Sequence, residues 1–226
     1  MNLGINELKV QLMNILKKLS IIVFVLSVIA TSFTTNAVEN DFKSRIEKSP
    51  YKLLAKVGGK LFDDIALLSA QERVQPEVMR VLIHQDLMPY IDYRYAAYKI
   101  LGKYVKTASK QQRAEFVEVM RHYLENTYAQ ALTQYKNQQV KFEGDKDTGN
   151  KRIAVVHSEI VQQGSSNIRI EFKFRKNRKT GQWKAFDMVV EGISLLNSKQ
   201  AEITRQIREH GLDEVIAQIR DKTNNA

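Results

Sequence analysis

The sequence contains no cysteine and little proline, the residue that most often interrupts helices and strands. Without cysteine there can be no disulfide, no thiolate zinc site and no cysteine nucleophile. A lipid-modified N-terminal cysteine is excluded as well, so we expect a processed chain to be free rather than lipid-anchored. Only three prolines are present, and no Pro/Gly-rich linker divides the 226 residues. We therefore expect one globular domain, large enough to bury a core without cross-links.

The motifs of common enzymes are also missing. No two of the four histidines have the spacing of metal ligands, and there is no HExxH sequence. No phosphate-binding loop or dinucleotide fingerprint occurs, and Gly164-Ser165-Ser166 lacks the second glycine of a nucleophile elbow. The acidic pairs Asp63-Asp64 and Asp145/Asp147 are interpreted as solvated side chains. We predict no metal, no cofactor and no catalysis, although scattered residues could still assemble an active site in the fold.

One short apolar run lies near the N-terminus. Leu19–Ala30 carries no charge, Lys17-Lys18 precede it, and Thr35-Asn36-Ala37 offers small residues for cleavage. This pattern predicts a cleavable signal peptide over residues 1–37, with translation starting at Met13, and export to the periplasm. Residues 38–226 would then form the single folded domain. Because a membrane span needs about 20 apolar residues, an uncleaved anchor helix is the weaker alternative.

The charge balance is strongly basic, with a formal net charge of +10 at pH 7. Four charged residues leave the first 37 residues at +2, so the remainder carries +8. This balance favours anionic partners, which include nucleic acid, anionic lipid headgroups and acidic proteins. The basic stretch Arg175–Lys179 is predicted to be a hairpin tip, and export would separate the chain from cytoplasmic nucleic acid. We therefore expect no nucleic-acid binding.

Helical periodicity fills the first half of the expected domain. Ser49-Pro50 is a typical helix start, Pro76 opens a second helix, and Pro89 is expected to start a third. A capping-box pattern, Ser109 to Gln112, predicts the start of the longest helix, whose apolar side continues to Tyr135. The aromatic residues along this helix fit either an ordinary core or the wall of a cavity.

After these helices the apolar period changes from 3.6 to 2. Apolar and charged residues alternate over Ile168–Arg175, Asn177–Gly181 forms a turn, and Gln182–Val190 returns as a partner strand. Earlier strands are expected over Lys151–Val161 and Val140–Phe142. Two further helices follow, Leu195–Glu209 and Leu212–Ile219. This order of elements predicts an α+β fold, in which helices precede and follow the strands in the sequence. The strands are expected to form a twisted antiparallel sheet with one solvent-exposed charged face and one buried apolar face.

Several short motifs then occur in a recognisable order and spacing. They are Asp86-Leu-Met-Pro-Tyr90, Leu101-Gly102 with the Gln112-Arg113 helix start, and Gln182-Trp-Lys-Ala-Phe-Asp187 leading into Glu191-Gly-Ile-Ser194. As an ordered set they resemble the MlaC family, the periplasmic phospholipid-binding carriers of the Mla lipid-asymmetry ABC transport system. The resemblance covers Ser49 to about Ile219. One minor departure is Tyr104-Val105-Lys106, where the family more often has an aromatic-Lys pair.

The resemblance implies a soluble, monomeric shuttle for glycerophospholipid. Its implied partners are an outer-membrane Mla lipoprotein-porin complex and an inner-membrane Mla ABC transporter complex, between which it maintains outer-membrane lipid asymmetry. The implied fold has an NTF2-like sheet core, with helices that form the mouth of a deep apolar pocket.

A lipid carrier needs apolar walls more than polar chemistry, and the alternating strands supply candidates. The residues predicted to line the pocket are Tyr128, Leu132, Ile168, Ile170, Phe172, Phe174, Met188, Val190 and Ile193. Each of them could equally be ordinary core, and the sequence does not separate the two roles.

Two other classes of protein remain possible at this point. The first is an exported enzyme on the same NTF2-like fold, acting on a small apolar substrate through strand residues such as His157, Glu159 and Asp187. The second is a structural periplasmic adaptor, which would have no cavity.

Overall fold

The computed structural model describes residues 47–162, 164 and 166–224. All of them belong to one compact unit, Ile46–Ala226. The predicted signal peptide, its cleavage site and the start at Met13 lie outside the described residues. Within the part of the chain that the structure describes, no helix combines the length and the apolar character that a membrane crossing requires.

The first helices begin and end close to where the proline pattern places them. Helix α2 (Pro50–Ala70) has Ser49 as its N-cap, whose side chain accepts a hydrogen bond from the Lys52 amide. Helix α3 (Pro76–Leu82) continues into the π-helical turn η1 (Ile83–Leu87) and the 3₁₀ turn η2 (Met88–Tyr90). Met88 is buried at this corner.

The third helix starts later than expected. Helix α4 (Tyr93–Leu101) is capped by Asp92 and not opened by Pro89. Ile91 forms a bridge to Ala185 of the sheet, and the Asp92 amide donates to the Ala185 carbonyl at 2.7 Å. This pairing holds the chain extended, so a helix can form only after it.

The longest helix is α5 (Lys110–Leu132), reached through the 3₁₀ segment η3 (Gly102–Lys106). The capping box is confirmed, because the Ser109 hydroxyl accepts from the Gln112 amide and the Gln112 side chain accepts from the Ser109 amide. After the sheet, α6 (Leu195–His210) begins with Ser194 as its N-cap, and α7 (Leu212–Asn224) follows Gly211.

The strands between α5 and α6 form an antiparallel meander, which confirms the predicted α+β class. Within the described residues the sheet contains β1 (Val140–Phe142), β2 (Ile153–Ile160), β3 (Ile168–Lys176), β4 (Trp183–Val190) and β5 (Ile193–Ser194), in that spatial order. A β-bulge at Lys173/Phe174 shifts the register between β3 and β4. The β4–β5 turn consists of Glu191 and Gly192, both with positive φ.

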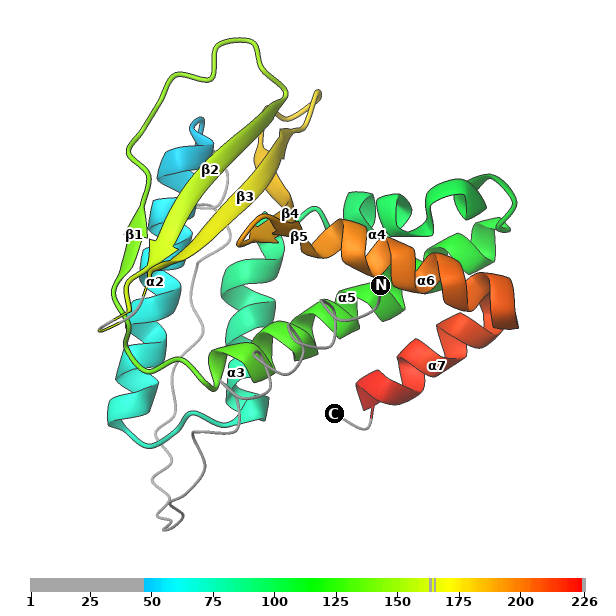
Figure 1. Cartoon of the computed structure of the whole chain (residues 1–226), viewed down its shortest axis with the longest axis horizontal. Coiled ribbons are helices and arrows are strands. Elements are labelled where there is room, and N and C mark those ends of the chain that lie inside the picture. Colours follow the sequence, from blue (N-terminus) through cyan, green and yellow to red (C-terminus); the bar gives the residue numbers. More distant parts are fainter. Residues whose placement is uncertain (1–46, 163, 165, 225–226) are drawn as a thin grey trace, which may run out of the picture. The chain divides into compact units, whose positions relative to one another are not determined.

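The core of the described chain consists of three apolar clusters. Helix α2 packs its Leu53 and Leu54 against Ala154, Val156 and Phe174 of the apolar sheet face. Helices α4, α5, α6 and α7 form a separate apolar cluster beside the β4–β5 edge (Figure 1). A third cluster joins α2, α3 and η1 to the second half of α5. The sheet therefore has helices on one face and along one edge.

Candidate functional site

The strand register brings most of the predicted pocket residues together on one face of the sheet. Phe172 pairs with Met188, Ile170 pairs with Val190, and Val190 pairs with Ile193. Residues two apart on a strand share a face, so Ile168 and Phe174 join them. Seven of the nine predicted residues thus form one apolar strip across β3, β4 and β5, called here the apolar strip: Ile168, Ile170, Phe172, Phe174, Met188, Val190 and Ile193.

The two ends of the apolar strip differ in how they are covered. Phe174 is only 2% exposed and lies in the core cluster beneath α2, with Phe172 packed at the margin of that cluster. At the other end, Ile168, Ile170, Met188 and Val190 are half-buried, and Ile193 is 39% exposed. None of these last five belongs to a core cluster of the described residues. At this end of the sheet the apolar side chains are therefore only partly covered by the rest of the described chain.

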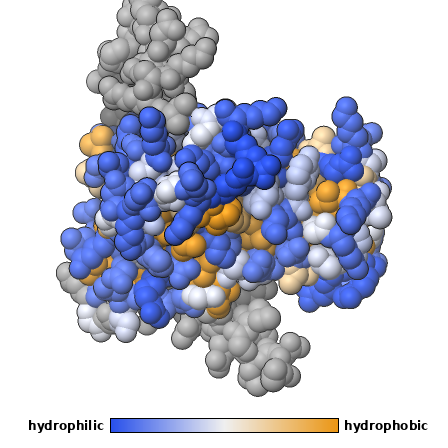
Figure 2. Space-filling view, turned by 90° about the horizontal axis from the view of Figure 1, so that it is seen from above, coloured by the Kyte–Doolittle hydropathy of each residue, from blue (hydrophilic) through white to orange (hydrophobic). Residues whose placement is uncertain are grey.

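Apolar residues are also visible at the molecular surface. Figure 2 shows hydrophobic residues in the middle of the face that is seen from above, between hydrophilic ones, and further hydrophobic residues toward its left and right ends. Leu195, directly after β5, adds another exposed apolar side chain beside Ile193, at 41% exposure. Monomeric proteins rarely leave apolar side chains together at the surface unless they bind something there.

The remaining two predicted residues, Tyr128 and Leu132, lie on α5 and not on the sheet. Both are half-buried and pack against the cluster of Leu61, Ile65 and their neighbours from α2, α3 and η1. Tyr135, just beyond α5, stacks on Phe62 with ring centroids 4.7 Å apart. The candidate residues thus form two apolar surfaces, one on the sheet and one on the α2–α5 side.

The pKa of the Tyr128 hydroxyl is affected by burial and by a charged residue of the sheet. Burial raises the pKa of its hydroxyl to about 12, and the negative charge of Asp187 on β4 adds to the increase. Sequence reasoning could find Tyr128 by its helical position but not this relation to a strand residue 59 positions later.

The three polar residues of the enzyme hypothesis do not converge. His157 and Glu159 lie on the charged face of β2, where His157 Nδ1 is 2.9 Å from Glu143 and Glu159 accepts from Asn167. Asp187 is engaged elsewhere: it accepts from Ser194 Oγ at 2.8 Å and from the Leu196 amide at 3.1 Å, and Lys173 Nζ lies 3.0 Å away. Its carboxylate holds the start of α6 on the sheet, which is a structural task.

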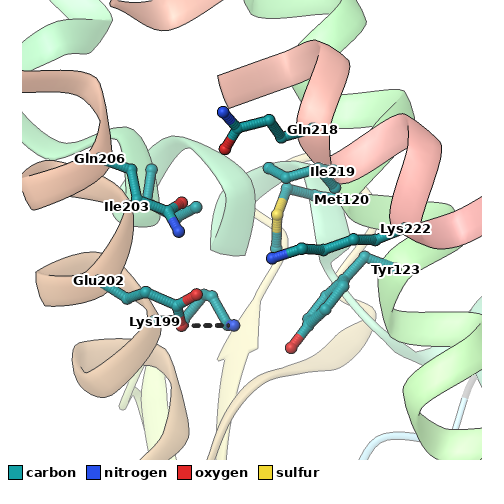
Figure 3. A pocket seen from close by; sticks show the side chains of 9 residues that line it. All are labelled: Met120, Tyr123, Lys199, Glu202, Ile203, Gln206, Gln218, Ile219 and Lys222. Atoms are coloured by element: carbon teal, nitrogen blue, oxygen red, sulfur yellow. Dashed lines mark hydrogen bonds and ion pairs between the residues drawn. The ribbon is translucent and has the colours of Figure 1, made fainter. Parts of the chain in front are cut away.

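Two hollows occur in the described part of the structure. One, of about 510 Å³, lies over β2, β3 and the β4–β5 turn, and its lining combines charged residues such as Glu159 and Arg169 with Ile170 of the apolar strip. A second, of about 140 Å³, lies between α5, α6 and α7 (Figure 3). There Lys199 is paired with Glu202 at 2.7 Å and lies over the Tyr123 ring, with its Nζ 4.5 Å from the ring centroid. Both hollows thus mix charged and apolar side chains, with Met120, Ile203 and Ile219 as the apolar part of the smaller one.

Comparison with known proteins gives consistent matches over most of the chain. The profile of the family described as MlaC protein matches residues 55–221. The chain is 34% identical over 179 residues to the intermembrane phospholipid transport system binding protein MlaC of Haemophilus influenzae, covering 79% of this chain and 84% of that protein. It is also 22% identical over 149 residues to a toluene tolerance protein of Pseudomonas putida, covering 66% of this chain and 68% of that protein.

One similar solved structure is that of a phospholipid-binding protein from Ralstonia solanacearum, determined in complex with a phospholipid. The TM-score is 0.69 at 17% sequence identity, and the superposition covers 78% of this chain and 98% of that one. At this identity the likeness establishes a common fold.

Proposed function

The chain belongs to the MlaC protein family, and from that membership we propose that it binds glycerophospholipid by the acyl chains and carries it between membranes. The relative from H. influenzae is named as a binding protein of intermembrane phospholipid transport. The observation that carries the proposal for this chain is the partly covered end of the apolar strip, formed by Ile168, Ile170, Met188, Val190 and Ile193.

The energetics of acyl-chain binding favour a site that is not fully closed. Burial of each methylene is worth about 0.8 kcal/mol, so two long chains in a perfectly fitted pocket would be held beyond the practical limit of non-covalent affinity. A carrier must release its lipid. Half-covered apolar surfaces on the sheet and on α5 suit a site that opens for loading and release.

We also propose the location, the oligomeric state and the partner complexes of the protein, on the basis of its family. We place the processed chain in the periplasm as a monomer, exchanging lipid with the outer-membrane lipoprotein-porin complex and the inner-membrane ABC transporter complex. The resulting traffic would maintain the lipid asymmetry of the outer membrane. We propose no catalytic step, because Asp187 is occupied at the start of α6 and His157 and Glu159 lie on the opposite sheet face from the apolar strip.

A matched pair of substitutions tests this function in cells. Ile193→Glu places a charge at the apolar strip, where it can stay hydrated while no lipid is bound but repels an acyl chain. Ile153→Glu makes the same change at a strand residue of similar exposure, 46% against 39%, on the charged face. In a strain lacking the gene, we expect the unmodified protein and Ile153→Glu to restore resistance of the outer membrane to detergent, and Ile193→Glu to fail.

Both variants should accumulate in the periplasm as folded protein. Restoration by Ile193→Glu at the level of the unmodified protein would remove the apolar strip from the transport function.

A further inference from the structure

The hydroxyl of Tyr128 is enclosed by protein and yet has no protein partner. Within the described residues it makes no hydrogen bond to another protein group, whereas the Tyr135 hydroxyl donates to the Gln138 carbonyl at 2.6 Å. No fully sealed polar side-chain atom of the described chain lacks a partner. The Tyr128 oxygen therefore keeps some accessible surface and opens onto a space. An enclosed tyrosine hydroxyl usually finds a partner, and that space is where this partner must come from.

The surroundings of Tyr128 restrict what the partner can be. The side chain packs against an apolar cluster that includes Leu61, Ile65, Met79, Ile83 and Met88. A group that reaches the hydroxyl must therefore be carried by a mostly apolar molecule. The phenol donates one hydrogen bond, so the complementary group is an acceptor oxygen.

The apolar surroundings separate a neutral acceptor from an anionic one. The side chains packed around Tyr128 are apolar, and burial raises the pKa of its hydroxyl, with a smaller contribution from Asp187. A phosphate oxygen would lose its hydration among these side chains. An ester carbonyl is neutral, accepts a hydrogen bond, and lies in a lipid where the acyl chains begin.

We propose that Tyr128 donates a hydrogen bond to an acyl-ester carbonyl of the bound lipid and so fixes how deep the lipid sits, with the charged headgroup left outside. This inference rests on the proposed function, since it assigns one contact to the lipid that the protein is proposed to carry. Tyr128 acts as a positioning and selectivity residue, and it makes the protein prefer ester-linked lipids to ether-linked ones.

The test compares two lipids that differ only in the carbonyl. Dioleoyl phosphatidylglycerol and its dioleyl ether analogue are titrated against protein purified from cells and stripped of endogenous lipid. We expect the unmodified protein to bind the ester lipid about three- to tenfold more tightly, the range that one net hydrogen bond supplies. Tyr128→Phe should bind both lipids with the affinity that the unmodified protein shows for the ether. Tyr135→Phe, whose hydroxyl is engaged within the chain, should keep the preference.

Three other results of this titration would contradict either the Tyr128 hydrogen bond or the carrier function. Equal affinity of the unmodified protein for the two lipids would overturn the inference while leaving the carrier function intact, and this arm does not depend on how the variants fold. Equal weakening of both lipids by Tyr128→Phe would assign the hydroxyl to the headgroup phosphate and would also overturn it. Failure of the unmodified protein to bind either lipid would reject the carrier function itself.

Discussion

Glu143 shows how much a single carboxylate can hold together in this fold. It follows β1 directly, and its side chain accepts from the His157 amide at 2.8 Å and lies 2.9 Å from His157 Nδ1 on β2. Lys146 also donates to it. Burial works to raise the pKa of Glu143, but the hydrogen bonds from Lys146 and His157 outweigh it and lower the pKa to about 2.

The lowered pKa of Glu143 predicts an acid-dependent loss of stability. Because the folded-state pKa lies below the usual value of 4.5, the ionised carboxylate stabilises the fold above pH 4.5, and this stabilisation is lost as the pH falls toward 2. We expect Glu143→Gln to lower the free energy of unfolding by about 1 to 2 kcal/mol at neutral pH, allowing for solvent screening. The gap from the unmodified protein should close between pH 4.5 and pH 2 in urea unfolding.

Glu171 offers a matched control on the same histidine. Its carboxylate lies 3.8 Å from His157 Nε2 and is 41% exposed, so Glu171→Gln should change stability by less than about 0.5 kcal/mol. A gap between Glu143→Gln and the unmodified protein that stays constant over this pH range would show that the charge of Glu143 contributes nothing.

At the scale of elements, two adjacent glycines in α2 have opposite surroundings. A Cβ at Gly58 would lie 2.7 Å from the Phe142 ring of β1, while a Cβ at Gly59 would have nothing within 4 Å. Gly58 therefore lets α2 approach the sheet closely, and Gly59 has no such task. The helix carries the entropic cost of both glycines.

The glycine pair gives a prediction with an internal control. Gly59→Ala should raise the free energy of unfolding by about 0.5 to 1 kcal/mol, since alanine favours the helix and meets no neighbour. Gly58→Ala gains the same helical preference but must displace Phe142, so we expect it to be about 1 kcal/mol or more less stable than Gly59→Ala. Thermal unfolding of the two variants measures the difference. If both alanine variants are equally stable, the packing of α2 on β1 is looser than described.

The sequence predicts elements better than the contacts between them. The capping box at Ser109, the strand alternation over Ile168–Phe174 and the antiparallel pairing are all confirmed, because local hydrogen bonds and periodicity determine them. The delayed start of α4 was missed, since it depends on the bridge from Ile91 to Ala185, which lies 94 residues away in the sequence. No local pattern reports such a pairing.

Some residues that carry the family resemblance prove to be structural in the described chain. Trp183 is 2% exposed and donates to the Lys48 carbonyl at 3.0 Å, and Asp187 accepts from the Leu196 amide in the first turn of α6. Gly102 has φ +55, and a Cβ there would lie 2.8 Å from the Gln200 side chain. These residues join helices to the sheet. The resemblance therefore points to the family, whereas the apolar strip must be found from the strand register.

At the scale of the whole molecule, the separation of core from apolar strip could not be predicted from sequence. Phe174 and Ile170 share one face and one strand, yet Phe174 lies under α2 and Ile170 does not. Alternation assigns a face, but only the path of α2 across the sheet decides which part of that face is covered. The nine predicted pocket residues stay a prediction: seven form the apolar strip, which has a covered and a partly covered end, and Tyr128 and Leu132 lie on α5.

The lipid that co-purifies with the protein is the most direct test of whether this chain carries glycerophospholipid. The protein purified from cells without detergent is extracted with organic solvent, and the extract is analysed by mass spectrometry. We expect glycerophospholipid with two acyl chains, in amounts comparable to the protein and greatly reduced in Ile193→Glu relative to Ile153→Glu. Folded protein that yields no glycerophospholipid, although the cells contain it in abundance, would contradict the proposed function.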